Sequence, residues 1–215
     1  MNPFWLILIL MIVWVSPVAA LSRSEIESEY AKSDNYEKMG RYTHAVSSLG
    51  MVFKEYPKGY AVNLRLGGLY TAAKKYGNAL THYDNAIVAV PDSLEPKLGK
   101  LSVLLAQERY ADAVELGTRI VEVDYYNYYG NLRLAYALQM TKKYELADKV
   151  NLKMLGLYPT DVLYLTQYGA LRYEQKDFST AKSVLMDVLL FEPDNLTAKS
   201  ILGLIKTANS TTKKK

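Results

Sequence analysis

The chain contains few side chains that can perform acid–base, nucleophilic or metal chemistry. It has two histidines, His44 and His82, and no cysteine. The carboxylates Glu25, Glu27 and Glu29 have the spacing of a solvated first turn of a helix. No glycine-rich phosphate loop, HExxH or GxSxG motif is present. Because an active site needs several convergent titratable groups, we predict that the protein is not an enzyme, holds no metal or cofactor, and carries both histidines at solvent-facing or edge positions.

The charge distribution argues against nucleic acid as a partner. The formal net charge is +4 at pH 7, and Lys213, Lys214 and Lys215 supply three of these charges. The rest of the chain is therefore near neutral, whereas phosphate binding needs clustered Lys and Arg. Hydrophobic residues make up 50% of the chain and charged residues 22%, which predicts a packed core rather than disorder.

The strongest pattern in the sequence is a constant period of about 34 residues. An alanine returns at this interval, an aromatic residue precedes each alanine by three positions, and a proline follows four of the five alanines by twelve positions. A constant period of this length is typical of stacked helical repeats. The alanines are Ala45, Ala79, Ala113, Ala147 and Ala181, the aromatics are Tyr42, Tyr76, Tyr110, Tyr144 and Phe178, and the prolines are Pro57, Pro91, Pro159 and Pro193, with Tyr125 in the remaining place.

Each period is expected to hold two helices. In the clearest unit, residues 60–93, one set of apolar and small residues recurs at helical spacing before a break near residues 74–77, and a second set follows. Small residues are needed where paired helices approach most closely. The proline ends the second helix, and helix-starting polar residues come after it. The two sets are Leu66, Gly67 and Tyr70, then Ala79, Tyr83 and Ala86.

By these residues the chain resembles the tetratricopeptide repeat (TPR) family from residue 26 to about residue 208. The resemblance implies an all-α, right-handed α-solenoid of five helix-turn-helix repeats plus a C-terminal capping helix. The implied boundaries are 26–59, 60–93, 94–127, 128–161 and 162–195 for the repeats, 196–208 for the capping helix and 209–215 for a disordered basic tail.

Two repeats depart from the family pattern. Repeat 1 has Lys32 and Ser33 where a large apolar residue and a glycine are usual, so its first helix is expected to act as a polar cap. Repeat 3 has Lys100 and Leu101 at the same positions, which predicts a one-residue slip that turns inward the residues Leu101, Ser102 and Leu105.

The resemblance also implies where a partner binds. In this family the first helices line the concave surface, and partners are contacted from fixed positions on them. The pair of repeats that grips a terminal carboxylate with Lys and Asn in some members has no counterpart here. Carried onto this chain, the partner-binding residues are Tyr30, Asp34, Arg65, Tyr129, Arg133, Tyr136, Gln139, Gln167 and Tyr173, with Glu95 and Glu174 beside them.

The resulting hypothesis is a protein–protein interaction scaffold that binds a partner peptide or helix in the concave groove of the superhelix. Tyrosine and arginine suit this function because each combines a large apolar body with a directional polar end. The alternative is a structural subunit or adaptor of a cell-envelope assembly complex, which uses its convex faces and the stretch Tyr125–Tyr129 instead.

The N-terminus has the pattern of a secretory signal peptide. Residues 4–15 are an uninterrupted apolar run, and Pro17 and small residues follow up to Ala20. We therefore predict residues 1–20 to be a signal peptide and the protein to be exported to the periplasm. Residues 1–20 contain no Lys or Arg, so an uncleaved membrane anchor over residues 4–21 remains the alternative, and it would be the only route to a membrane.

Overall fold

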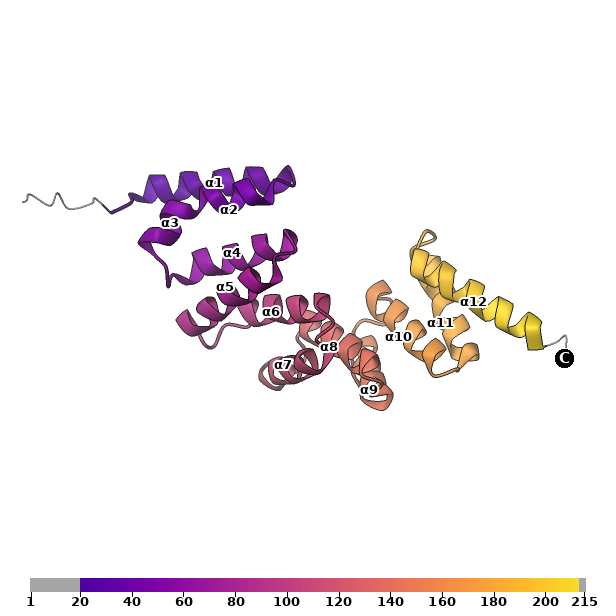
Figure 1. Ribbon diagram of the computed structural model, residues 1–215. Coiled ribbons are helices and arrows are strands. Elements are labelled where there is room, and N and C mark those ends of the chain that lie inside the picture. The colour runs from indigo at the N-terminus through magenta and orange to yellow at the C-terminus, as the bar shows by residue number, and fades with distance from the viewer. Residues whose placement is uncertain (1–19, 213–215) are drawn as a thin grey trace, which may run out of the picture.

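The protein is all-helical in the computed structural model, which describes residues 20–212 and their side chains up to residue 208. Within that range twelve helices follow one another and no strand occurs, which confirms the all-α prediction (Figure 1). The predicted signal peptide, apart from Ala20, and the terminal lysines lie outside the described residues. The helices are α1 (Arg23–Lys38), α2 (Tyr42–Ser48), α3 (Gly50–Glu55), α4 (Tyr60–Ala72), α5 (Tyr76–Ala89), α6 (Glu95–Ala106), α7 (Tyr110–Val123), α8 (Tyr128–Met140), α9 (Tyr144–Leu157), α10 (Val162–Glu174), α11 (Phe178–Phe191) and α12 (Leu196–Thr212).

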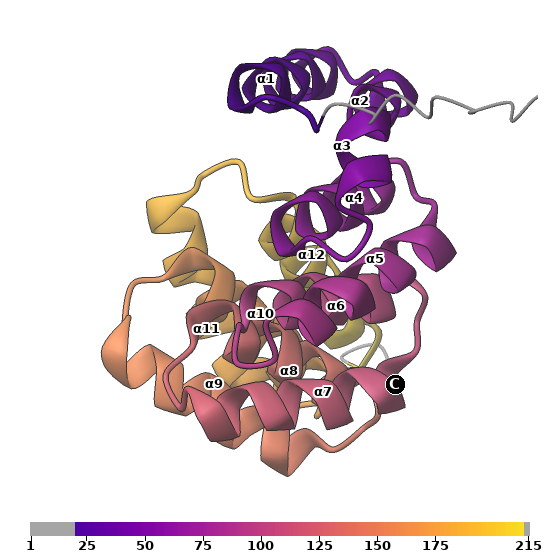
Figure 2. The ribbon, with the colours of Figure 1, turned by 90° about the vertical axis from the view of Figure 1, so that its left-hand side faces the viewer.

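The helices pack as consecutive pairs along a curved array. Each first helix contacts the second helix of its own pair, and each second helix contacts the first helix of the next pair. Neighbouring first helices also contact one another, from α4 to α6, α8, α10 and α12. Figure 2 shows α6, α8, α10 and α12 toward the inside of the curve and α7, α9 and α11 around the outside. The first helices therefore form the inner surface.

The turn inside each pair is the same in all five repeats. Gly40, Lys74, Glu108, Lys142 and Lys176 occupy equivalent places in successive repeats, and all have positive φ angles between 57° and 69°. In each turn the next amide donates to the carbonyl five residues earlier, at 2.8–2.9 Å, as in a Schellman motif. The left-handed conformation costs a non-glycine residue about 1 kcal/mol. Packing of the two helices must outweigh this cost, since four of the five turns lack glycine.

The turns between repeats are also equivalent, even where the proline is missing. An amide two residues after the proline place donates to the carbonyl one residue before it, at 2.9–3.2 Å in every repeat. In repeat 3 this bond joins the Asn127 amide to the Asp124 carbonyl, and Tyr125 occupies the proline place. Proline is thus compatible with this turn but not required for it.

The paired helices meet at the small residues that the period predicts. All five period alanines have 0% exposure, and so has Ser33 in α1. A Cβ added to Gly67 would lie 2.7 Å from the Tyr83 ring, and one added to Gly169 would lie 2.6 Å from Leu185. A larger residue at these positions would push the two helix axes apart.

In repeat 3, a different set of first-helix residues packs into the core. Leu101 is buried as expected, but Val103 and Leu104 fill the rest of the core, while Ser102 and Leu105 are half-buried. The predicted inward turn is therefore confirmed for Leu101 and only partial for Ser102 and Leu105, although Leu105 packs against the core around Leu101. The large Tyr83 side chain accounts for the shift, because it lies against both α4 and α6, where the chain has glycine at Gly67 and Gly99.

The two ends of the array differ from the expected pattern. At the start, α1 begins at a capping box between Ser22 and Glu25, and the second helix of repeat 1 is divided at Leu49 into α2 and α3. At the other end, α12 continues to Thr212, so the predicted break after residue 208 is not observed.

Among the helices within residues 20–212, none combines the length and the apolar character that a membrane span requires.

His82 is half-buried at the junction of repeats 1 and 2, so the prediction of a solvent-facing or edge position is wrong for it. Its ring stacks on Tyr70 with centroids 5.3 Å apart and meets Phe53 edge-on. Its Nδ1 lies 2.9 Å from Asn63 Oδ1, and the Asn63 side-chain amide donates to the Pro57 and Gly59 carbonyls of the preceding turn. His44, in contrast, is exposed.

We predict that Ala113→Leu lowers the free energy of unfolding by about 1–3 kcal/mol, because Ala113 is fully buried between paired helices and overpacking forces them apart. Ala111→Leu, on the exposed face of the same helix, serves as the matched control and should change it by less than about 0.5 kcal/mol. Urea denaturation of both variants checks this, and equal losses would contradict the close-approach role.

We also predict that stability falls between about pH 7.5 and pH 5.5, because burial lowers the pKa of His82 from its usual value. The unfolded chain then binds a proton at a pH where the folded chain does not, so acid favours unfolding. His82→Gln should reduce this slope, and His44→Gln should leave it unchanged. Urea denaturation at several pH values measures both, and a wild-type slope in His82→Gln would refute the assignment.

Candidate functional site

The inner surface carries one groove that crosses several repeats. It has a volume of about 470 Å³ and runs across α6, α8 and α10 to the start of α12; we call it the inner groove. Four of the nine predicted partner-binding residues, Arg133, Tyr136, Gln139 and Gln167, line this groove. The full lining is Leu105, Leu132, Arg133, Tyr136, Gln139, Leu163, Thr166, Gln167, Ala170, Asn195 and Thr197.

Arg133 is the single charged side chain in this lining. Its Nη1 donates to the Leu98 carbonyl of α6 at 3.1 Å, and its guanidinium lies 5.2 Å from the centroid of the Tyr129 ring. Partial burial lowers the pKa of Arg133 from its usual value, which still leaves the group charged at neutral pH. Within the described part of the chain, no carboxylate forms an ion pair with it.

Two other polar residues of the inner groove, Gln139 and Gln167, tie neighbouring first helices together. Gln139 Nε2 donates to Glu174 Oε1 at 3.0 Å, and Gln167 Nε2 donates to the Leu132 carbonyl at 3.2 Å. Gln139 is only 5% exposed, so it mainly positions α8 against α10. Thr166 Oγ1 is buried and lacks a hydrogen-bond partner among the described residues.

Apolar side chains form the remaining wall of the inner groove. Leu105, Leu132, Leu163 and Ala170 come from α6, α8 and α10, and Leu163 is 54% exposed. Tyr136 lies beside them, 40% exposed, with its ring edge-on to Tyr110 at 6.2 Å. An incoming apolar side chain would therefore be removed from water on several sides.

A smaller hollow of about 400 Å³ surrounds Arg65, and we call it the Arg65 hollow. Arg65 occupies the same repeat position as Arg133 but forms an ion pair with Glu37 of α1. Across this hollow the Tyr60 hydroxyl donates to Glu95 Oε2 at 3.1 Å. The cation of this hollow is therefore already paired within the chain, and the carboxylate of Glu95 is held by a hydrogen bond.

The remaining predicted residues lie outside both hollows. Tyr30 packs against the core of repeat 1, and burial raises its pKa. Asp34 pairs with Lys38 at 2.6 Å, and the ring of Tyr173 lies 5.6 Å from that of Phe178. Tyr129 is 53% exposed and covers Arg133 at the rim of the inner groove.

An exposed cluster of tyrosines occupies the turn before repeat 4. Tyr125 and Tyr126 are 60% and 54% exposed, and the Lys153 ammonium lies 3.8 Å from the Tyr125 ring centroid. Behind them, the Tyr128 hydroxyl donates to Asp161 at 2.8 Å, and burial together with this bond raises the pKa of Tyr128 to about 12. The run of tyrosines in the sequence indicated this cluster, but the position of Lys153 against it follows from the packing of α9.

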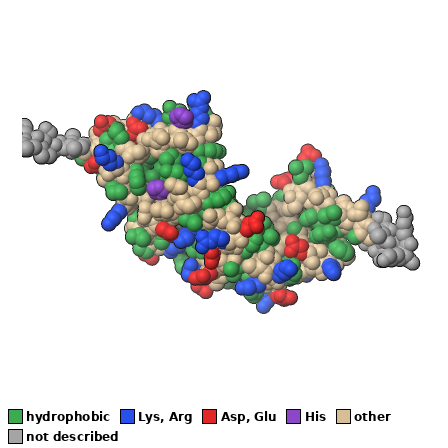
Figure 3. Space-filling view, in the orientation of Figure 1, with side chains coloured by type: hydrophobic (Ala, Val, Ile, Leu, Met, Phe, Trp, Pro, Cys, Tyr) green, Lys and Arg blue, Asp and Glu red, His purple; other side chains and the backbone are tan. Residues whose placement is uncertain are grey.

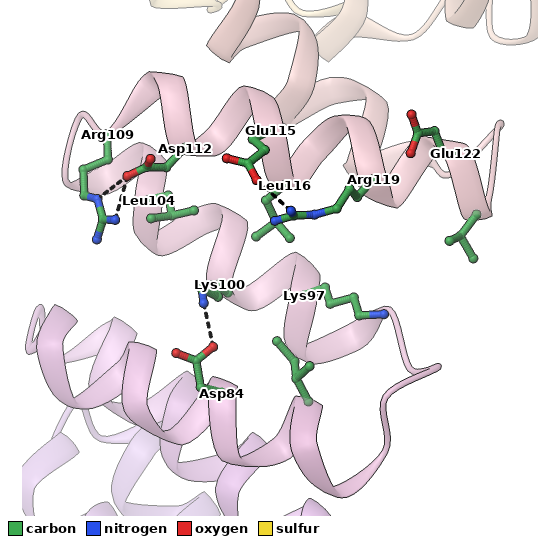
Figure 4. A pocket seen from close by; sticks show the side chains of 12 residues that line it. Asp84, Lys97, Lys100, Leu104, Arg109, Asp112, Glu115, Leu116, Arg119 and Glu122 are labelled. Atoms are coloured by element: carbon green, nitrogen blue, oxygen red, sulfur yellow. Dashed lines mark hydrogen bonds and ion pairs between the residues drawn. The ribbon is translucent and has the colours of Figure 1, made fainter.

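A third hollow, of about 630 Å³, lies between the second helices α5 and α7 with α6 at its base (Figure 4). We call it the charged hollow. Figure 4 shows that its ion pairs join neighbouring side chains. They link Lys100 to Asp84, Arg109 to Asp112 and Arg119 to Glu115, and Lys97 donates to the Pro91 carbonyl.

Charged side chains of both signs are mixed over the visible face in Figure 3, with no single large basic patch there. No group of three or more His, Asp or Glu side chains within the described residues has the arrangement to hold a metal ion.

Comparisons with known proteins agree with this architecture. Residues 30–93 match the tetratricopeptide repeat family model. Among solved structures, MamA (residues 41 to the end) from Desulfovibrio magneticus RS-1 superposes with a TM-score of 0.72 at 17% identity, covering 83% of this chain and 99% of its own. A TPR protein from Parabacteroides merdae gives 0.75 at 14% identity over 85% of this chain and 72% of its own. YrrB, described as a TPR protein with an unusual peptide-binding site, gives 0.65 at 13% identity over 83% and 92%.

These likenesses confirm the predicted TPR-type α-solenoid. No curated protein matches the chain in sequence.

We predict that Asn131→Leu loosens the tyrosine turn and destabilises the protein by about 1–3 kcal/mol, because the buried amide of Asn131 donates to the Tyr125 and Asn127 carbonyls. Hydrogen exchange at the amides of residues 125–131 should accelerate. Asn78→Leu, on the exposed face of α5, is the control and should change neither quantity. Unchanged exchange in Asn131→Leu would show that other contacts hold the turn.

Proposed function

We propose that the protein is an interaction scaffold that binds a segment of a partner protein in the inner groove. The observation that carries this proposal is the groove itself, which joins an apolar wall to Arg133 and Tyr136 on the face that the first helices share. Large apolar contacts supply affinity when they leave water, and a few directional polar groups fix the register of the partner.

The chemistry of the lining favours a peptide or helix over a small molecule. The groove is open and crosses the first helices of repeats 3, 4 and 5 to the start of the capping helix α12, so an elongated ligand can lie along it. Arginine and tyrosine are enriched among the residues that dominate binding energy. TPR proteins generally mediate protein–protein interactions, and the peptide-binding site named for YrrB is consistent with this function.

The tyrosine cluster favours a second candidate function. Tyr125 and Tyr126 project from the turn before repeat 4, and exposed aromatic residues are efficient contact residues in protein interfaces. In this alternative, the protein is a subunit or adaptor of a cell-envelope assembly complex and binds through its convex faces. Both functions need a protein partner and no nucleic acid.

We further propose that residues 1–20 direct export to the periplasm. The support is the apolar run of residues 4–15 followed by small residues up to Ala20. N-terminal sequencing of the mature protein distinguishes the alternatives: a chain that begins at Leu21 supports a cleaved signal peptide, and an intact N-terminus supports a membrane anchor.

We predict that Arg133→Ala and Tyr136→Ala each weaken binding of a partner co-purified with the native protein by at least about thirtyfold, since truncating a dominant contact residue costs about 2 kcal/mol or more. Arg119→Ala, in the charged hollow, is the matched control and should leave the affinity unchanged. Calorimetry or a surface-based binding assay with the purified partner measures this.

The opposite pattern would support the alternative function. If Tyr125→Ser with Tyr126→Ser abolished binding while Arg133→Ala and Tyr136→Ala retained it, the inner groove would be excluded as the binding surface.

A further inference from the structure

Arg133 carries a positive charge in the inner groove that the described part of the chain does not neutralise. Its counterpart Arg65 shows how the same position is neutralised two repeats earlier. There the guanidinium reaches back along the chain to Glu37, which lies 28 positions earlier on the preceding first helix. The equivalent place before Arg133 is Leu105, and Leu105 lines the inner groove.

Because leucine stands at position 105 where the equivalent position 37 has glutamate, the surroundings of Arg133 differ chemically from those of Arg65. In the Arg65 hollow the cation already forms an internal pair with Glu37, and Glu95 adds a negative charge to the lining, so an acidic ligand meets no unpaired cation there. In the inner groove the cation stands beside an apolar wall, and its bond to the Leu98 carbonyl occupies only one of its five N–H donors. Partial desolvation also strengthens the attraction between this guanidinium and an incoming anion.

We propose that the inner groove selects partner segments in which an acidic side chain is flanked by apolar residues, with the carboxylate paired to Arg133. This inference rests on the proposed function, because it names the partner chemistry of the same groove. The carboxylate takes the role that Glu37 has toward Arg65, and the flanking apolar residues lie against Leu105, Leu132 and Leu163. Tyr129 covers the guanidinium by a cation–π contact and holds it in place.

An internal Asp or Glu side chain suits this site better than a terminal carboxylate. Arg133 is the single charged residue of the lining, so the groove is matched to one carboxylate. The groove also continues past Arg133 toward Asn195 and Thr197, so the bound segment can extend on both sides of its acidic residue.

A display library of short random peptides on the purified protein tests the proposal. Selected peptides are expected to contain an acidic residue next to large apolar residues. In a synthetic copy, replacement of that residue, Glu→Gln or Asp→Asn, should weaken binding to the wild-type protein by about tenfold, as expected for loss of one charge-assisted hydrogen bond. The same peptide with a free or an amidated C-terminus should bind equally.

Three variants of the protein test whether the preference for an acidic residue comes from the unpaired charge of Arg133. The Arg133→Gln variant should bind the acidic peptide and its Gln or Asn counterpart equally. Leu105→Glu should place an internal carboxylate beside Arg133 and remove the preference in the same way, while Leu105→Gln should retain it. Far-UV circular dichroism checks that each variant is folded.

The outcomes distinguish this inference from the proposed function. If substitutions at Tyr136 and Ala170 weaken peptide binding but the peptides show no preference for an acidic residue, the inference is overturned and the groove remains the binding site. A preference that follows the free C-terminus would also overturn it. If no selected peptide is sensitive to groove substitutions, both the inference and the proposed function are wrong.

Discussion

The close approach of paired helices at one small residue per repeat is the constraint on which the rest of the structure depends. The five period alanines are completely buried, and so are Ser33 and Ala135 on the first helices, while Gly67 and Gly169 lie so close to Tyr83 and Leu185 of the second helices that a Cβ would not fit. Because the spacing is the same in every repeat, each pair stacks on the next with the same turns on both sides. The first helices are thereby kept together on one side of the array, and the surface that they share becomes continuous.

This shared surface is held together by polar bridges from one repeat to the next. Arg133, Gln139 and Gln167 each bond to a group 35 residues away on a neighbouring first helix. The bridges from Gln139 and Gln167 satisfy polar groups, but the one from Arg133 leaves its charge without a carboxylate among the described residues. In the charged hollow of Figure 4, by contrast, Lys100, Arg109 and Arg119 each form an ion pair with a carboxylate of the chain, and only Lys97 bonds to a backbone carbonyl instead. The proposed binding of a partner in the inner groove rests on this difference in electrostatic compensation.

The sequence was sufficient for the repeats but not for the site. Period and residue type predicted the helix pairs and the turns, because both are set by contacts within about 40 residues. The residues of the groove were harder to predict, because the position of a side chain in the repeat does not reveal whether it already forms an ion pair within the chain. Arg65 and Arg133 look identical in the sequence register, and only the packing shows that one pairs with Glu37 while the other stands near Leu105. The burial of His82 and the contact of Tyr83 with α6 were not predicted for a similar reason, since Phe53 and Gly99, the neighbours concerned, belong to adjacent repeats.

Site-specific photo-crosslinking in the native cell tests the central claim most directly, because it reports which surface meets the partner without assuming its identity. A photoreactive residue at Ala170, in the inner groove, is compared with one at Val88, which is 78% exposed on α5. The account predicts a discrete adduct from position 170 and none from position 88. An adduct from position 88 alone would contradict it and assign binding to the outer helices.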